Sequence, residues 1–154
     1  MFFIHYRVGF AGNWRDFDMG AAVAQEGFDT PPLIVVIEDE PMVLSAYELM
    51  FEAWGYRFVG ADSATVALAK LAVLRSPPDF IVADYRLAEG QTGTQAICVL
   101  RQAFGHDIPG LLVTGETSIE TLRDAASTGF PLLRKPVGSR QLQDAVARGI
   151  ATGF

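Results

Sequence analysis

The segment LIVVIEDEP at residues 33–41 joins five consecutive apolar residues to three carboxylates and a proline. An unbroken apolar run of this length is typical of a strand that is buried on both faces of a parallel sheet. Pro41 fits the first turn of a helix, because that turn does not use its N–H. The segment therefore predicts a buried strand, an acidic turn and the start of a helix in direct succession.

The same succession continues from residue 33 to about residue 152. The expected strands cover residues 33–37, 56–60, 80–83, 110–114 and 130–134. Between them apolar residues recur at helical spacing, as at Val43, Tyr47 and Trp54, and stretches end at Gly55 or Pro77. This alternation predicts an α/β fold, a single doubly wound (βα)5 domain with a five-stranded parallel sheet.

Residues 1–32 form an N-terminal extension whose composition differs from that of the rest of the chain. Its aromatic residues show no sustained periodicity and are Phe2, Phe3, Tyr6, Phe10, Trp14, Phe17 and Phe28. We therefore expect two regions, an aromatic-rich extension at 1–32 and a folded domain at 33–152. The extension can cover the sheet edge or a helix face, exchange with a second copy, or remain disordered. Its sequence leaves these alternatives open.

The bulk composition limits the classes of partner and the compartment. With 154 residues and 19% charged residues, the chain fits one globular domain. Its net charge of −6 argues against nucleic acid and anionic membranes as general partners. The single cysteine, Cys98, fits a reducing cytoplasm, and its apolar helical surroundings predict a buried core position. We find no signal peptide and no apolar run of the ~18 residues that a membrane span needs, so we expect a cytoplasmic protein.

Four expected strand ends carry polar side chains suited to phosphoryl chemistry. They are Glu38-Asp39-Glu40, Asp84, Thr114-Gly115 and Lys135-Pro136. The carboxyl ends of parallel strands share one edge of an open sheet, where ligands bind. We therefore expect these side chains to converge on one acidic pocket that also contains a hydroxyl and an ammonium group.

The chemistry of these groups suggests their roles. A carboxylate can accept a phosphoryl group as an aspartyl phosphate, and Asp84 is the expected nucleophile. Phosphoryl transfer needs a hard cation such as Mg²⁺, which Asp39 and Asp84 would ligate through oxygen. Lys135 and the Thr114 hydroxyl would bind phosphoryl oxygens, and Gly115 would leave room beside the strand.

Each group alone also has an ordinary interpretation. The acidic triplet at 38–40 can be a solvated strand end, Asp84 can cap a turn, and Lys135 can be a surface lysine. Asp39, Asp84, Thr114 and Lys135 follow one another at intervals of 45, 30 and 21 residues. Four suitable strand ends in this order favour a site over coincidence.

Over about residues 33–152 the chain resembles the receiver domains of response regulators in two-component signal transduction. The resemblance rests on the segments 37–41, 82–87, 113–115 and 134–136. Segment 129–137 resembles receivers that are fused to hybrid sensor histidine kinases. The resemblance implies a flavodoxin-like, CheY-like domain with the strand order 2-1-3-4-5.

The resemblance also implies a phosphoacceptor in a two-component system or phosphorelay. Asp84 would take its phosphoryl group from the phosphohistidine of a sensor histidine kinase or a phosphotransfer protein. The family pattern adds the backbone carbonyl of Arg86 as a ligand of Mg²⁺ and places Glu38 at a metal-bound water. Such a domain is not an enzyme for external substrates, because it catalyses only its own phosphorylation and slow dephosphorylation.

Output is expected to proceed through protein contacts. The chain ends at Phe154 after the last expected helix, so we expect no output domain. A homodimer could form through the face of residues 117–150 or through the N-terminal extension.

Several positions depart from the usual receiver pattern. Leu132 stands where many receivers carry the Tyr or Phe that follows the site threonine inward. Leu87-Ala88 replaces a frequent Met-Pro, and Glu38 replaces a more frequent Asp. Arg86 and Glu116 flank the face from which water would attack, and Arg86 can shield the phosphoryl group or pair with Glu116.

Two alternatives remain from other functional classes. A degenerate receiver would act purely as a binding module. A haloacid-dehalogenase-type phosphatase would also form an aspartyl phosphate with Mg²⁺, but its nucleophile is the first Asp of Asp-x-Asp after strand 1. Here that position reads Glu38-Asp39-Glu40, which speaks against the phosphatase.

Overall fold

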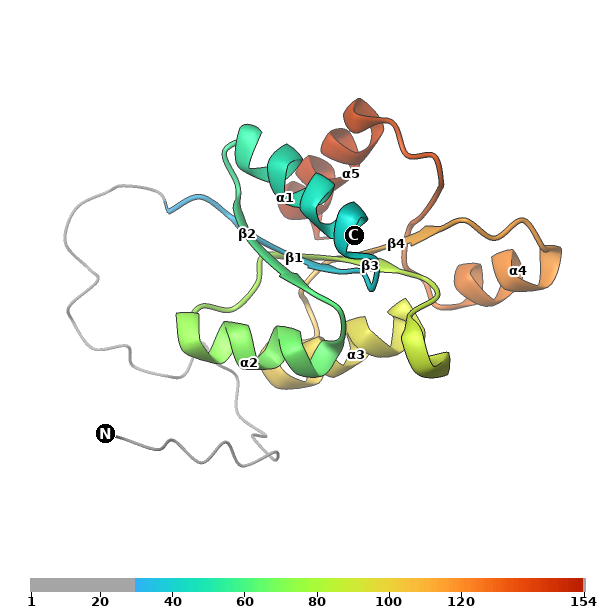
Figure 1. Cartoon of the computed structure of the whole chain (residues 1–154), viewed down its shortest axis with the longest axis horizontal. Coiled ribbons are helices and arrows are strands. Elements are labelled where there is room, and N and C mark those ends of the chain that lie inside the picture. The colour runs from blue at the N-terminus through green and yellow to red at the C-terminus, as the bar shows by residue number, and fades with distance from the viewer. Residues whose placement is uncertain (1–29, 154) are drawn as a thin grey trace.

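The computed structural model of the chain describes residues 30–153 and shows a central sheet with helices on both faces (Figure 1). The expectations for the N-terminal extension up to residue 29 lie outside the described residues. The strands are β1 Leu33–Ile37, β2 Arg57–Ala61, β3 Phe80–Asp84, β4 Gly110–Thr114 and β5 Leu132–Arg134. The α-helices are α1 Pro41–Ala53, α2 Ala64–Leu74, α3 Gly93–Phe104, α4 Ile119–Ser127 and α5 Ser139–Thr152, with a 3₁₀ turn, η2, at Ala88–Gly90.

The five strands are parallel and lie in the order β2-β1-β3-β4-β5. This confirms both the predicted fold class and the predicted strand order. The central strand, β3, pairs with β1 and β4, so Asp84 ends a strand that has neighbours on both sides. The order also brings the carboxyl ends of β1, β3 and β4 next to one another.

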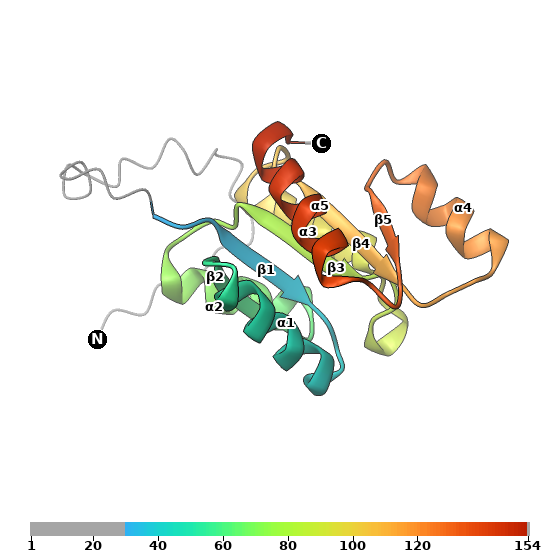
Figure 2. The same cartoon turned by 90° about the horizontal axis from the view of Figure 1, so that it is seen from above.

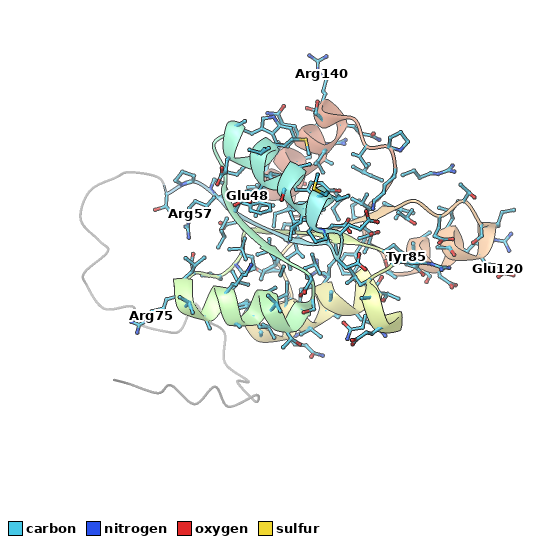
Figure 3. All side chains as sticks on the ribbon, viewed as in Figure 1. Glu48, Arg57, Arg75, Tyr85, Glu120 and Arg140 are labelled. Atoms are coloured by element: carbon cyan, nitrogen blue, oxygen red, sulfur yellow. The ribbon has the colours of Figure 1, made fainter. Side chains whose placement is uncertain are left out.

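Alternation of side chains along the strands divides the core into two layers. The layer under α1 and α5 contains Ile34, Val36, Phe51, Phe80, Val82, Leu142 and Val146. The layer under α2 and α3 contains Leu33, Val35, Ile37, Leu71, Ile81, Ile97 and Leu100. Figure 2 shows α1 and α5 crossing one face of the sheet, and Figure 3 shows the side chains that fill both layers.

The edge helix α4 differs from the other helices in its packing. It lies beside β5 at the edge of the sheet (Figure 2). Ala125 is its single buried residue, whereas Ile119 at its start is 67% exposed. Few buried apolar contacts hold this helix, so it belongs to the less stable part of the described domain.

Local hydrogen bonds explain where several elements begin. Ser63 and Thr92 cap α2 and α3 through their side chains, and the latter is a capping box with Gln95. Residues 117–120 have the sequence pattern of a capping box, but the residue that caps α4 is Ser118, whose Oγ accepts from Thr121 N at 3.2 Å. Ser139 does not cap α5, since Gly138 is the N-cap of this helix and no side chain caps it.

Two strands begin later than expected because turns use their first residues. Tyr56 N donates to Phe51 O at 3.0 Å, which closes the end of α1 and moves the start of β2 to Arg57. Phe130 N donates to Thr128 Oγ1 at 3.3 Å, and β5 begins only at Leu132.

Cys98 is exposed, so the prediction of a buried cysteine is wrong. Helix α3 buries Ala96, Ile97, Leu100 and Phe104, and position 98 lies away from that stripe. In the described range 30–153, no helix combines the length and apolarity required to cross a bilayer.

Candidate metal and phosphorylation site

The carboxyl edge of the sheet gathers the side chains that the strand ends supply. Glu38 and Asp39 follow β1, Asp84 is the last residue of β3, and Thr114 is the last residue of β4. Lys135 follows β5, and its backbone N donates to Thr114 O at 2.8 Å, which holds the lysine beside β4. A pocket of about 310 Å³ opens there, lined by Asp39, Glu40, Asp84, Arg86, Leu87, Thr114, Gly115, Glu116 and Lys135.

Lys135 links two carboxylates from neighbouring strands. Its Nζ lies 3.2 Å from Asp84 Oδ2 and 3.4 Å from Glu38 Oε2. The Glu38 side chain is 1% exposed and that of Asp84 is 12% exposed. Glu38 also accepts a hydrogen bond from Glu40 N at 3.1 Å. The lysine therefore compensates charge that burial would otherwise make costly.

Burial and neighbouring charges shift the pKa of both partners. Burial raises the pKa of Glu38, and the charge of Asp84 adds to this, against the lowering effects of the Glu40 N–H and Lys135. Burial alone would lower the pKa of Lys135, but Asp84 and Glu38 outweigh it and the pKa is raised. Lys135 thus remains a permanent positive charge next to Asp84 at neutral pH.

Three carboxylates form a cluster that fits a hard divalent cation. Oxygen atoms of Glu38, Asp39 and Asp84 all lie within 4.8 Å of one another. The donor set contains oxygen atoms alone, which is what Mg²⁺ prefers in proteins. Arg86 lines the same pocket, and the role of its backbone carbonyl as a ligand stays a prediction.

Thr114 presents its hydroxyl from a buried position. The residue is 1% exposed, and its Oγ1 accepts a hydrogen bond from Glu116 N at 3.0 Å. A hydroxyl that accepts such a bond keeps its own O–H for donation to an incoming oxygen. At Gly115 an added Cβ would stand 3.8 Å from Lys135 Cδ, so the glycine keeps this part of the pocket lined by backbone.

Two residues near the site were not found by the sequence analysis. At Gly93 an added Cβ would collide with the carbonyl oxygen of Asp84, and Gly93 N donates to Tyr85 O at 2.9 Å. The feature of the sequence that could have identified Gly93 is a glycine at the start of a helix, directly after the loop that follows Asp84. Tyr47 was expected only as part of an apolar helix face, yet it shares a hollow with Lys135.

Burial raises the pKa of Tyr47 to about 12. Of the smaller effects, the charge of Lys135 lowers this pKa, and the charges of Glu38 and Asp84 raise it. The phenol of Tyr47 is therefore neutral in the folded protein at neutral pH and adds no charge beside the site.

Comparison with known proteins identifies the family. Residues 34–147 match the family described as the response regulator receiver domain. The phyllosphere-induced regulator PhyR of Methylorubrum extorquens is 31% identical over 81 residues, which are 53% of this chain and 30% of PhyR. The transcriptional regulatory protein ZraR of Klebsiella oxytoca is 28% identical over 119 residues, 77% of this chain and 26% of ZraR. The chain thus spans less than a third of either relative.

Solved structures show the same fold. A response regulator receiver protein from Sinorhizobium medicae superposes with a TM-score of 0.67 at 24% identity, covering 80% of this chain and 98% of that one. A receiver domain protein from Clostridium thermocellum gives 0.67 at 22% identity, covering 78% and 94%. The family match extends over more than half of the sequence and coincides with the sheet and its acidic edge, and this chain belongs to the response regulator receiver domain family.

Proposed function

We propose that this chain is the phosphoacceptor of a two-component system or phosphorelay, with Asp84 as the residue that becomes phosphorylated. The observation that carries the proposal is the position of Lys135 Nζ, 3.2 Å from Asp84 Oδ2, within a cluster of carboxylates at the sheet edge. This arrangement supplies a nucleophile, a fixed cation and a place for a divalent ion in one pocket.

The proposed reaction transfers a phosphoryl group from a phosphohistidine. An oxygen of Asp84 attacks phosphorus, a P–O bond forms, and the P–N bond to the donor imidazole breaks. Lys135 and the Thr114 hydroxyl bind oxygens of the transferred group and stabilise their negative charge. Asp39, Asp84, the Arg86 carbonyl and, through water, Glu38 would hold Mg²⁺, which when bound neutralises phosphoryl charge.

A second hollow beside the pocket supports a sensor histidine kinase or phosphotransfer protein as the partner. It has a volume of about 250 Å³ and is mainly apolar, with Val43, Tyr47, Met50 and Val137 in its lining. Lys135 lines both hollows, so a partner seated here would be next to Asp84. On the same helix Met42 is 83% exposed and Leu49 is 70% exposed, which extends the apolar surface.

Further parts of the proposal concern output and location. We propose that the domain signals through protein contacts and acts catalytically only on its own phosphorylation and dephosphorylation. The face of residues 117–150, where Ile119 is 67% exposed, is a candidate homodimer surface. The single cysteine fits the reducing cytoplasm that we propose as its location.

The test is incubation with Mg²⁺ and acetyl phosphate or phosphoramidate, followed by intact-protein mass spectrometry. We expect the mass of one added phosphoryl group, and no addition in Asp84→Ala. Asp124→Ala, which removes an exposed carboxylate on α4, is the matched control and should be phosphorylated normally. A domain that accepts no phosphate would be a binding module, and repeated turnover of phosphomonoesters would indicate a phosphatase.

A further inference from the structure

The outer face of α2 is unusually apolar for a helix at the surface of a domain. Val66, Ala69 and Val73 recur at helical spacing and are exposed, with Val73 at 84%. Leu74, at the end of the helix, is 50% exposed, and Val99 on the neighbouring helix α3 is 39% exposed. We call these five residues the α2–α3 patch. Exposed apolar side chains that gather on neighbouring helices can mark an interaction site.

Charge distinguishes this face from the rest of the domain. Neither α2 nor α3 contains an Asp or Glu, although the chain carries a net charge of −6. The cations of α2 and its C-cap are Lys70, whose Nζ donates to Gly60 O at 2.6 Å, and Arg75. The face therefore suits an apolar segment that carries some negative charge.

The described chain begins at the edge of the α2–α3 patch. Pro32 O accepts from Arg57 N at 3.0 Å, and Leu33 N donates to Asp79 Oδ2 at 2.7 Å. Arg57 Nη2 in turn contacts Ser76 Oγ at 3.0 Å. The start of β1 is thus held against residues 76–79, directly after the end of α2. Figure 3 shows Arg57 and Arg75 on this same side of the molecule.

We propose that residues 1–29 of the same chain cover the α2–α3 patch. This segment holds seven aromatic residues and, with four acidic and two basic residues, a net charge of −2, counting His5 as neutral. Helix α2 has 11 residues and a length of about 16 Å, which about five extended residues can span. The segment is long enough, complementary in charge, and joined to the patch at its edge.

Covalent connection favours this occupant over a separate partner. A segment joined through residues 30–32 experiences an effective concentration on the order of millimolar at a site near its attachment point. The apolar hollow beside Lys135 is lined mainly from α1 and α5, whereas the patch belongs to α2 and α3 on the opposite face of the sheet (Figure 1). Covering it would leave the proposed docking surface for the phosphodonor accessible.

Tryptophan fluorescence of the full chain tests the proposal. The chain has two tryptophans, and Trp54 is the C-cap of α1 at the opposite face, so Trp54→Phe leaves Trp14 as the sole reporter. We expect Trp14 emission to be blue-shifted relative to a peptide of residues 1–32. We also expect iodide quenching to be lower by on the order of twofold, because burial removes part of the indole from water.

Charge insertion into the patch provides the specific variant. Adding Val66→Glu and Val73→Glu to the reporter should restore peptide-like emission and quenching. Both side chains are exposed, and an unchanged circular dichroism spectrum checks that the fold is intact. Leu49→Glu, an equivalent exposed position on α1, is the matched control and should leave Trp14 shielded. Phosphorylation of Asp84 by acetyl phosphate should proceed equally in the reporter and in its α2 variant.

Three outcomes would overturn the proposal. Peptide-like Trp14 emission in the parent would show that the segment does not pack on the domain. Loss of shielding in Leu49→Glu but not in the α2 variant would place the segment on the other face. Shielding that disappears on dilution together with a dimeric mass would mean that the patch is covered by a second copy.

Discussion

Arg86 Nε and Glu116 Oε1 lie 2.9 Å apart and form an ion pair that joins the loop after β3 to the loop after β4. Both residues line the pocket that contains Asp84, so the pair crosses its rim. The side chains are 67% and 32% exposed, and exposed pairs contribute only about 0–1 kcal/mol to stability. Its larger effect is expected on access of water to the phosphoryl group.

Replacement of Arg86 by alanine should shorten the lifetime of phosphorylated Asp84. The shield is worth at most about 1 kcal/mol, so the dephosphorylation rate should rise by up to about fivefold with little change in melting temperature. The measurement is loss of the phosphoryl group over time by intact mass. Arg123→Ala, at an exposed position on α4, is the control. An unaltered lifetime in Arg86→Ala would count against a shielding role.

Mg²⁺ should stabilise the folded domain through the carboxylate cluster. At a concentration of 100 times its dissociation constant, a ligand specific to the folded state adds about 2.7 kcal/mol to the free energy of unfolding. We expect a rise in melting temperature that a chelator reverses. Asp39→Asn should abolish most of the rise, and Asp124→Asn should retain it. Equal responses of the two variants would exclude Asp39 from the metal site.

Gly93→Ala should destabilise the domain and disturb the site together. The added Cβ would meet the carbonyl oxygen of Asp84, so β3 and the start of α3 must separate. Overpacking of this kind costs about 1–3 kcal/mol. Urea unfolding measures the loss, and phosphorylation should slow in parallel. Gly138→Ala is the control, since its Cβ would approach Gln141 Cβ only to 4.0 Å. Equal stability of both variants would contradict the close approach.

Tyr47 should make the stability of the domain depend on alkaline pH. Burial raises its pKa from 10.0 to about 12 in the folded state. The neutral phenol therefore stabilises the fold fully below pH 10, and this contribution is lost as the pH rises to about 12, when the folded state also ionises. The loss should be about 2–3 kcal/mol, at 1.36 kcal/mol per pKa unit.

Tyr47→Phe checks this prediction, because it keeps the ring and removes the ionisable group. The difference in unfolding free energy between parent and variant should be constant from pH 7 to about 9 and should change above pH 10 in favour of the variant. If the unfolding free energies of the parent and of Tyr47→Phe change equally with pH throughout the alkaline range, the phenol is not protected from ionisation.

The apolar runs along the sequence were sufficient to predict the architecture of the domain. The apolar runs that form β1, β3 and β4 are buried on both faces, and only a parallel sheet covered by helices buries such runs completely. The strand order matched the expectation from the receiver resemblance. The expected and observed strands differ only at their ends, as at Leu132, where single hydrogen bonds decide between adjacent residues.

The order of residues along the chain specifies which polar groups end the strands, because each of these groups follows directly after an apolar run. The tertiary structure alone decided their geometry: Lys135 reaches Asp84 and Glu38, Gly93 admits the Asp84 carbonyl, and Tyr47 comes to lie beside the lysine. It also placed Cys98 at the surface, because a cysteine fits either side of an apolar helix and only the packing of α3 chooses. Local spacing specifies elements, whereas contacts between residues separated by 51 or 97 positions arise only when the sheet closes.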